Sequence, residues 1–195
     1  MSPAPRILVF AGSLRRDSFN KKLARLAADA VRGAGGEATL VDLADLPMPL
    51  YDGDLEGSQG VPENGRRFKK LMMEHHGLFI ASPEYNSSIS AVLKNTIDWA
   101  SRPEKGETAL QSFDGKVAAL CSASTGALGG LRSLATVRSI LGNIRVLVLP
   151  EQLAIPKANE AFAEDGKLKD AKQQGTLESI AKRLVTVVAS LRAGA

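Results

Sequence analysis

Short runs of apolar, β-branched residues alternate along this chain with longer stretches whose apolar residues recur at helical spacing. The runs predict five strands, at 6–10, 38–41, 78–81, 117–121 and 144–149. Because these runs are almost continuously apolar and are separated by helices, the strands must be parallel and covered on both faces. The alternation therefore predicts an α/β fold with a doubly wound, five-stranded parallel sheet and helices on both faces.

Five strands wound in this way suit the order 2-1-3-4-5, in which the winding reverses beside the first strand. Ligands bind there, at the carboxyl ends of the strands, so the loops after the first, third and fourth strands should meet at one site. The chain shows no linker and no repeat, which predicts a single domain over residues 1–195. The Pro- and Gly-rich segment 46–65 is expected to be a long surface loop.

The first of these loops, GSLRRDSFN, combines the features of an anion site. Ser18 is placed to cap the following helix, whose start offers free N–H groups and the positive end of a dipole. Further hydrogen-bond donors in the loop are Ser13 and Asn20, and fixed positive charge comes from Arg15 and Arg16. A phosphate monoester suits this set, whereas the patterns G-x-G-x-x-G and G-x-x-x-x-G-K-[ST] of nucleotide sites are missing. A capped helix beside solvated arginines is the alternative interpretation.

The third and fourth loops add a surface for a flat ligand. In SPEYNSS, Pro83 stiffens the turn, other backbone N–H groups stay free, and Tyr85 offers an aromatic cover. A heterocycle bound at its rim by backbone groups fits such a loop, although Tyr85 could equally be an ordinary exposed aromatic. The loop CSASTGALGG (121–130) has small residues that let a backbone approach a ligand closely, or that simply form a tight turn.

Other residues that often carry chemistry are predicted to be structural. Trp99 and Cys121 fit core positions, and Asp42 fits a turn or a helix cap. His75 and His76 are adjacent and so face different sides of any helix or strand; we expect helix-end or surface residues and no metal site.

Charge and composition indicate which classes of partner and which cell compartment to expect. The 25 Lys and Arg residues exceed the 21 Asp and Glu residues by little, and they are scattered, which does not indicate nucleic-acid binding. We expect a cytoplasmic protein without a membrane segment, because there is no signal sequence, no apolar run near 18 residues and a single cysteine.

Taken together, the loops resemble those of the NADPH-dependent FMN reductase family of the flavodoxin-like superfamily, particularly its quinone, chromate and azo-compound reductases. The matching segments are GSLRRDSFNKKLA (12–24), LPMPLYDGDLE (46–56), SPEYNSSISAVLKNTIDWASRP (82–103) and SASTGALGG (122–130). After about residue 150 the match is looser.

The resemblance implies a flavodoxin-like, FMN-binding domain with NADPH or NADH as electron donor. It implies that the FMN phosphate is held by Ser13, Arg15, Ser18 and Asn20, with Arg16 contributing. It further implies that the isoalloxazine is lined by Pro83, Glu84, Tyr85 and Asn86, and approached by Ser124. The flavin carries the chemistry, so no catalytic side chain is required, and Tyr85 shapes the substrate face.

The implied activity is two-electron transfer from NAD(P)H to quinones or other small acceptors, namely chromate, azo compounds or free flavin. Donor and acceptor would share one open face of the flavin, which predicts ping-pong kinetics. The family also implies a homodimer or homotetramer, and Met48, Leu50 and Tyr51 form a candidate partner surface unless they pack on their own domain. The alternatives are a flavodoxin-like electron carrier, which a pI near 9.3 disfavours, or a non-catalytic flavin-binding sensor.

Overall fold

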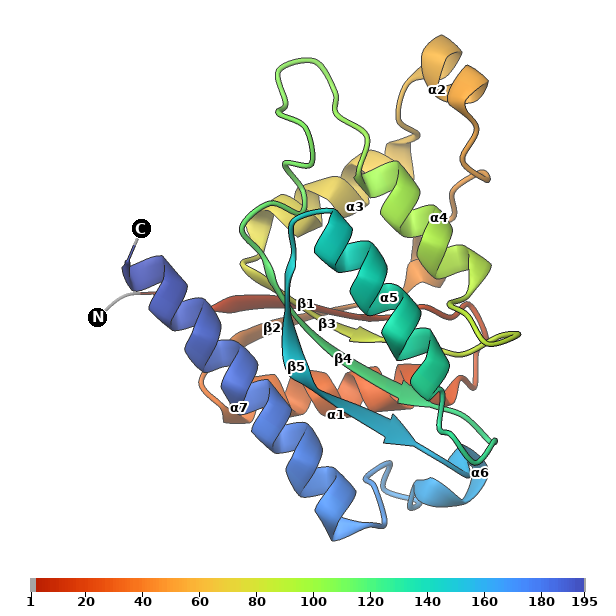
Figure 1. Ribbon diagram of the computed structural model, residues 1–195, viewed down its shortest axis with the longest axis vertical. Coiled ribbons are helices and arrows are strands. Elements are labelled where there is room, and N and C mark those ends of the chain that lie inside the picture. The colour runs from red at the N-terminus through yellow and green to blue at the C-terminus, as the bar shows by residue number, and fades with distance from the viewer. Residues whose placement is uncertain (1–2, 195) are drawn as a thin grey trace.

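A five-stranded sheet lies between two layers of helices in the computed structural model, which describes residues 3–194 (Figure 1). All neighbouring strands are parallel, and their order is β2-β1-β3-β4-β5. The strands are β1 (Arg6–Ala11), β2 (Glu37–Val41), β3 (Gly77–Ala81), β4 (Val117–Ala123) and β5 (Leu147–Ile155). The predicted fold class and strand order are confirmed.

Alternating strand residues build a separate core on each face of the sheet. The helices are α1 (Phe19–Gly33), α2 (Gly53–Gln59), α3 (Glu63–Glu74), α4 (Ala91–Ala100), α5 (Leu131–Asn143), α6 (Ala158–Ala161) and α7 (Ala171–Ala193), with a 3-10 helix η1 (Leu43–Asp45). Ile7 and Val9 of β1 belong to the core beneath α1 and α7, whereas Leu8 and Phe10 belong to the core beneath α3, α4 and α5. Helices therefore cover both faces, as predicted. Across residues 3–194, no helix is both long enough and apolar enough to span a membrane.

The fifth strand was predicted at 144–149, and that prediction is wrong at both ends. Arg145 has a φ of 70°, so the chain turns sharply after α5 and the strand begins only at Leu147. The strand then continues past Pro150 by means of a bulge: Val148 lies opposite Ala118, but Gln152 lies opposite Leu120. Proline is tolerated because β5 is an edge strand.

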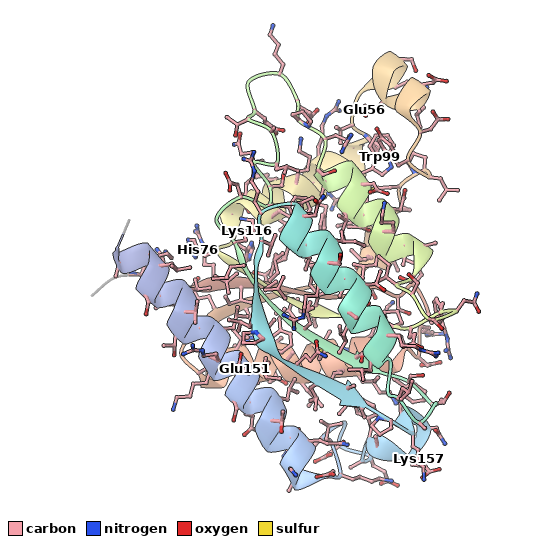
Figure 2. The ribbon with its side chains drawn as sticks, viewed as in Figure 1. Glu56, His76, Trp99, Lys116, Glu151 and Lys157 are labelled. Carbon is pink, nitrogen blue, oxygen red and sulfur yellow. The ribbon has the colours of Figure 1, made fainter. Side chains whose placement is uncertain are left out.

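The segment 46–65 is not a loop throughout, because it contains α2 and the start of α3. Its first part is tied to α4: Trp99 Nε1 donates to Pro49 O at 2.8 Å, and the rings of Tyr51 and Trp99 meet edge to face at 5.0 Å. Trp99 is fully buried, which confirms its predicted core position (Figure 2). None of the residues of α2 is buried, and this helix projects from the body of the molecule (Figure 1).

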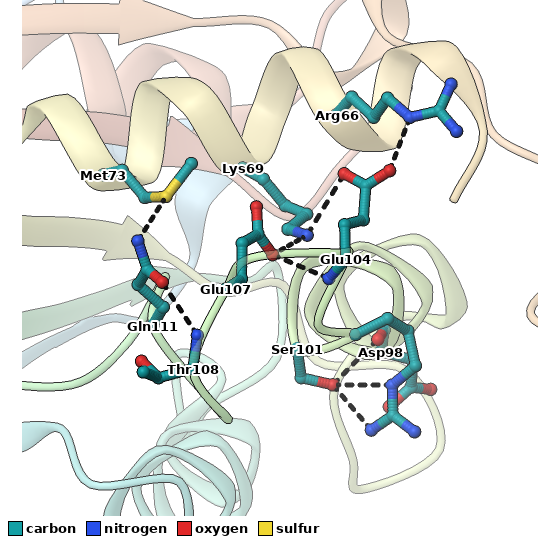
Figure 3. A network of polar contacts seen from close by, with 10 residues as sticks. Arg66, Lys69, Met73, Asp98, Ser101, Glu104, Glu107, Thr108 and Gln111 are labelled. Atoms are coloured by element: carbon teal, nitrogen blue, oxygen red, sulfur yellow. Dashed lines mark hydrogen bonds and ion pairs between the residues drawn. The ribbon is translucent and has the colours of Figure 1, made fainter. Parts of the chain in front are cut away.

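An ion-pair network fixes the segment between α4 and β4 against α3 (Figure 3). Lys69 is almost completely buried, and its Nζ lies 2.5 Å from Glu107 Oε2 and 3.4 Å from Glu104 Oε2. Arg66 Nε donates to the other oxygen of Glu104 at 2.6 Å. Burial alone would raise the pKa of Glu107, but the hydrogen bonds from Lys69 and from Glu104 N, together with the charge of Lys69, outweigh burial and the pKa is lowered. The network therefore ties the segment that follows α4 to two successive turns of α3.

The two histidines follow one another at the end of α3. His75 is the C-cap residue, so the helix-end prediction holds, but it is buried and not a surface residue. Its Nε2 lies 2.7 Å from Thr39 Oγ1. His76 Nδ1 accepts a hydrogen bond from Arg6 N at 3.0 Å. Cys121 is fully buried, and burial raises the pKa of its thiol, which confirms the predicted core role.

Candidate functional site

Three loops meet at the carboxyl edge of the sheet. The first residue of each loop still forms a backbone hydrogen bond with the neighbouring strand, as the residues within the sheet do. Gly12 N donates to Ala81 O at 3.0 Å, and Ser82 N donates to Cys121 O at 2.8 Å. Ser124 N donates to Ile155 O at 3.0 Å. The first, third and fourth loops therefore start side by side, as the strand order predicts.

The first loop presents hydroxyl and N–H groups at the start of α1. Ser18 occupies the N-cap position, as predicted, but its hydroxyl makes no cap hydrogen bond. Ser13 and Ser18 are both buried. The first backbone hydrogen bond of α1 runs from Lys22 N to Ser18 O, so the N–H groups just before Lys22 are the free donors of the helix start. These groups suit an anion.

Positive charge at this loop is divided between paired and unpaired groups. Lys21 Nζ lies 2.7 Å from Asp42 Oδ2 and is thereby neutralised. Burial would raise the pKa of Asp42, but hydrogen bonds from Lys21 and from Ala44 N outweigh it and the pKa is lowered. Asp42 also caps η1, which confirms its predicted role. Arg15 and Arg16 are exposed and, within residues 3–194, make no ion pair. They are available to a ligand phosphate.

Asn20 joins the first loop to the fourth. Its Nδ2 donates to Ala123 O at 2.9 Å, and Ala123 N donates to its Oδ1 at 3.0 Å. An amide nitrogen carries two hydrogens, so one donor remains after this pairing. Asn20 is thus an anchor of the loop in addition to any contact with a ligand.

Ser90 holds the first loop against α4. Its hydroxyl donates to Gly12 O at 2.5 Å and accepts from Leu93 N at 3.2 Å, so it also caps the helix. A Cβ added at Gly12 would lie 2.9 Å from Leu93 Cβ, which explains why the single glycine of this loop stands there. Ser90 was missed from the sequence, although a serine just before an apolar helical stretch is an N-cap signal.

The third loop forms a tight hairpin around Asn86 and Ser87. Tyr85 N donates to Ser88 O at 3.0 Å, and Ser88 N donates to Tyr85 O at 3.1 Å. Asn86 and Ser87 have φ values of 49° and 65°, the positive values typical of a type I′ turn. Pro83 is buried at the base, Asn86 lies at the tip, and Tyr85 is 46% exposed, so its ring is available at the surface.

The side chain of Glu84 turns away from that hairpin toward α5. Its Oε1 accepts from Arg132 Nε at 2.7 Å, and its Oε2 accepts from Arg132 N at 2.9 Å. Burial would raise the pKa of Glu84, but the hydrogen bonds from Arg132 and Ser133 outweigh it and the pKa is lowered. The carboxylate is therefore committed to α5, and only the backbone of Glu84 remains for a ligand. Nothing in the local sequence marks Arg132.

The fourth loop brings its backbone close to β5 through glycines. Gly129 and Gly130 have positive φ values of 62° and 90°. A Cβ at Gly129 would lie 2.7 Å from Ile155 C, so no larger residue fits. Ser124 Oγ accepts from Gly126 N at 3.3 Å, which places this hydroxyl at the start of the loop. The predicted site residues therefore lie on three adjacent loops and in the first turn of α1. Asn20 links α1 to the end of β4, and Glu84 links the third loop to α5.

The chemistry of these groups fits a phosphorylated flat ligand. Among residues 3–194, no group of three His, Cys, Asp or Glu residues is placed to hold a metal ion. The anion-binding groups lie in the first loop, and the exposed aromatic lies in the third. FMN has both parts, a phosphate and a planar ring system.

Comparison with known proteins agrees with this geometry. Residues 5–160 match the family model described as NADPH-dependent FMN reductase. An NAD(P)H-dependent FMN reductase of Pseudomonas aeruginosa is 34% identical over 194 residues, covering 98% of this chain and 100% of that protein. A quinone reductase of Pseudomonas putida is also 34% identical, over 195 residues, covering 99% of this chain and 100% of that protein.

The structural comparison gives the same class. The flavoenzyme NAD(P)H:(acceptor) oxidoreductase of Paracoccus denitrificans superposes with a TM-score of 0.80 at 28% identity, covering 95% of this chain and 98% of that one. The fold and the site define a flavodoxin-like oxidoreductase. The chain belongs to the NADPH-dependent FMN reductase family. The family, the enzyme class and the dependence on FMN and NAD(P)H expected from the sequence are confirmed.

Proposed function

We propose that this protein transfers two electrons from NAD(P)H to quinones and other small acceptors, among them chromate, azo compounds and free flavin. The observation that carries the proposal is the first loop, where two arginines that have no carboxylate partner within residues 3–194 lie beside buried serines at the start of α1. Relatives named as quinone reductases support the choice of acceptor. The NAD(P)H donor suits an action in the cytoplasm.

In this proposal, the phosphate of FMN is held by Ser13, Arg15, Arg16, Ser18 and Asn20. Backbone groups of Pro83, Glu84, Tyr85 and Asn86, with Ser124, line the ring. When bound, FMN supplies the redox chemistry by taking a hydride from NAD(P)H and giving up two electrons. The three loops would hold the ring at its rim and on one face, and would leave its other face to the donor and the acceptor.

A single open face requires donor and acceptor to enter in turn, and this predicts ping-pong kinetics. Initial rates over a grid of NADPH and quinone concentrations test the prediction. Parallel double-reciprocal lines are expected. Intersecting lines would show that donor and acceptor bind together and would refute the shared face.

The decisive test of the function begins with the absorption spectrum of the purified protein, which should show bound FMN. NAD(P)H oxidation is then followed with a quinone, dichromate and an azo dye. Rapid, acceptor-dependent oxidation is expected. A flavin spectrum without NAD(P)H oxidation would favour the electron carrier or the sensor, and exchange of electrons with a partner reductase would single out the carrier.

The proposal includes a homodimer or homotetramer. Leu50 is 76% exposed on the segment that leads into α2, and none of the residues of α2 is buried. Tyr51 packs on Trp99 of its own domain, so the partner surface expected at Met48, Leu50 and Tyr51 is reduced to its outer part. Light scattering at micromolar concentration is the test. A mass near 20.6 kDa would refute the oligomer.

A further inference from the structure

Glu84 and Arg132 connect the third loop to the first turn of α5. Arg132 donates from Nε to Glu84 Oε1 at 2.7 Å, and its Nη2 contacts the same oxygen. The backbone N–H groups of Arg132 and Ser133 donate to Glu84 Oε2, at 2.9 and 3.4 Å. The carboxylate is thus held by the arginine side chain and by the helix start together.

The two partners differ in their access to water. The side chain of Glu84 is 7% exposed, whereas that of Arg132 is 56% exposed. A buried carboxylate has little water to solvate it, so it depends on protein donors. If the guanidinium is removed, Glu84 has to shift toward water or stay poorly solvated, whereas an exposed arginine that loses its partner is solvated at once. Loss of this ion pair therefore disturbs the third loop, which carries Glu84, more than it disturbs Arg132.

The contacts of Glu84 hold the backbone that it shares with its neighbours in the chain, Pro83 and Tyr85. A second contact holds the third loop against α5, because Ser133 Oγ donates to Ser82 O at 3.1 Å. A Cβ at Gly130 would lie 2.9 Å from Ser122 Cβ, so α5 begins as close to the strand ends as a backbone can. The start of α5 consequently determines where the backbone of the third loop lies.

We propose that Arg132 is a positioning residue for the flavin ring, acting through Glu84 on the backbone from Pro83 to Tyr85. This inference rests on the proposed function, because it concerns the same cofactor site. It assigns different tasks to two arginines: Arg15 acts on the phosphate, and Arg132 acts on the ring. Riboflavin has the ring but no phosphate, so it separates the two tasks.

The experiment is a titration of apoprotein with FMN and with riboflavin, for the wild type and for variants. Arg132→Ala should weaken both flavins by the same factor, about tenfold, which corresponds to roughly one lost charge-assisted hydrogen bond. Glu84→Gln should act in the same direction, and the double variant should bind little worse than the weaker single one, because both changes break one contact. Arg132→Lys keeps a charge and a donor, so its affinities should lie between those of wild type and Arg132→Ala.

Arg145→Ala is the matched control, since it removes an exposed arginine whose Nη1 lies 3.6 Å from Asp114 beyond the other end of α5. Its affinities for both flavins should equal those of wild type.

Unchanged binding of both flavins by Arg132→Ala would overturn the inference, even if its melting temperature fell, and so would weaker binding of FMN alone. If Arg132→Ala does not fold, Arg132→Lys and Glu84→Gln decide by the same comparison. A wild type that bound neither flavin would overturn the proposed function as well, whereas tight wild-type binding with no effect in the variants would overturn only the role of Arg132.

Discussion

Asn20 and Ala123 exchange two hydrogen bonds, from Asn20 Nδ2 to Ala123 O at 2.9 Å and from Ala123 N to Asn20 Oδ1 at 3.0 Å. The amide side chain thereby acts as an additional backbone partner at the end of β4. It sets the start of α1 against the fourth loop, 103 residues away in the sequence. The shape of the first loop accordingly depends on a strand that lies far from it in the chain.

Asn20→Ala should destabilise the apoprotein as well as the cofactor complex. The change leaves the buried N–H and C=O of Ala123 without these partners, and an unsatisfied buried group costs about 1 to 3 kcal/mol. Urea unfolding of the apoprotein measures the loss directly. An apoprotein as stable as wild type would contradict the anchoring role of Asn20.

Arg15→Ala should weaken FMN by about tenfold to a hundredfold, because a charge-assisted phosphate contact contributes roughly 1.5 to 3 kcal/mol. Riboflavin binding and apoprotein stability should not change, since Arg15 is exposed and unpaired among the described residues. Titration of apoprotein with both flavins checks this. Arg25→Ala, which removes an exposed arginine from α1, is the control. Equal FMN affinity in Arg15→Ala and wild type would remove Arg15 from the phosphate site.

Most of the fold follows from local patterns. Apolar runs and helical spacing place the strands and their order because burial on both faces demands such residues. The start of β5 could not be read this way, since Arg145 adopts a positive φ that its residue type does not reveal. The continuation past Pro150 also depends on tertiary contacts: Arg138 Nη1 donates to Leu149 O at 2.7 Å within the bulge.

The site, like the fold, was predictable in part from local sequence patterns and depends in part on contacts between residues far apart in the chain. The strand order places the three loops together, and their residue types indicate a phosphate and a flat ring. The partners of Asn20 and Glu84 lie 103 and 48 residues away, so no local pattern contains them. The hairpin at Asn86 and Ser87 was missed because its turn lacks the glycine that usually marks a type I′ turn.

Stability should fall as the pH drops from about 6.5 toward 4, in part because of His76. Burial, followed by the charges of Arg192, Arg6, Lys116 and His75, lowers its pKa from 6.5 to about 4 (Figure 2 shows His76 and Lys116). The unfolded chain takes up the proton first, so the contribution is complete above pH 6.5 and is lost as the pH falls through 4. The shift corresponds to about 3 kcal/mol at most, and screening at this half-buried site reduces it.

His76→Asn tests that contribution. The amide oxygen of asparagine can accept the hydrogen bond from Arg6 N that His76 Nδ1 accepts at 3.0 Å, but asparagine does not titrate. Urea unfolding of both proteins between pH 7.5 and 4 should show a smaller loss of stability in the variant. Parallel curves would exclude His76 as a source of the pH dependence.

Tyr85 should matter for planar acceptors and little for cofactor retention. Tyr85 is 46% exposed on the hairpin, and its backbone, not its hydroxyl, makes the hydrogen bonds to Ser88. Tyr85→Phe should keep FMN and most of the activity, because it retains the ring and the hairpin. Tyr85→Ala should raise the KM for a quinone by about twofold to tenfold, as expected for a lost aromatic contact of roughly 0.5 to 1.5 kcal/mol.

Chromate has no ring to stack, so its KM should stay unchanged in the same variant. An equal effect of Tyr85→Ala on both acceptors would show that the substitution disturbs the flavin site as a whole, and a large loss in Tyr85→Phe would assign the hydroxyl a direct part in turnover.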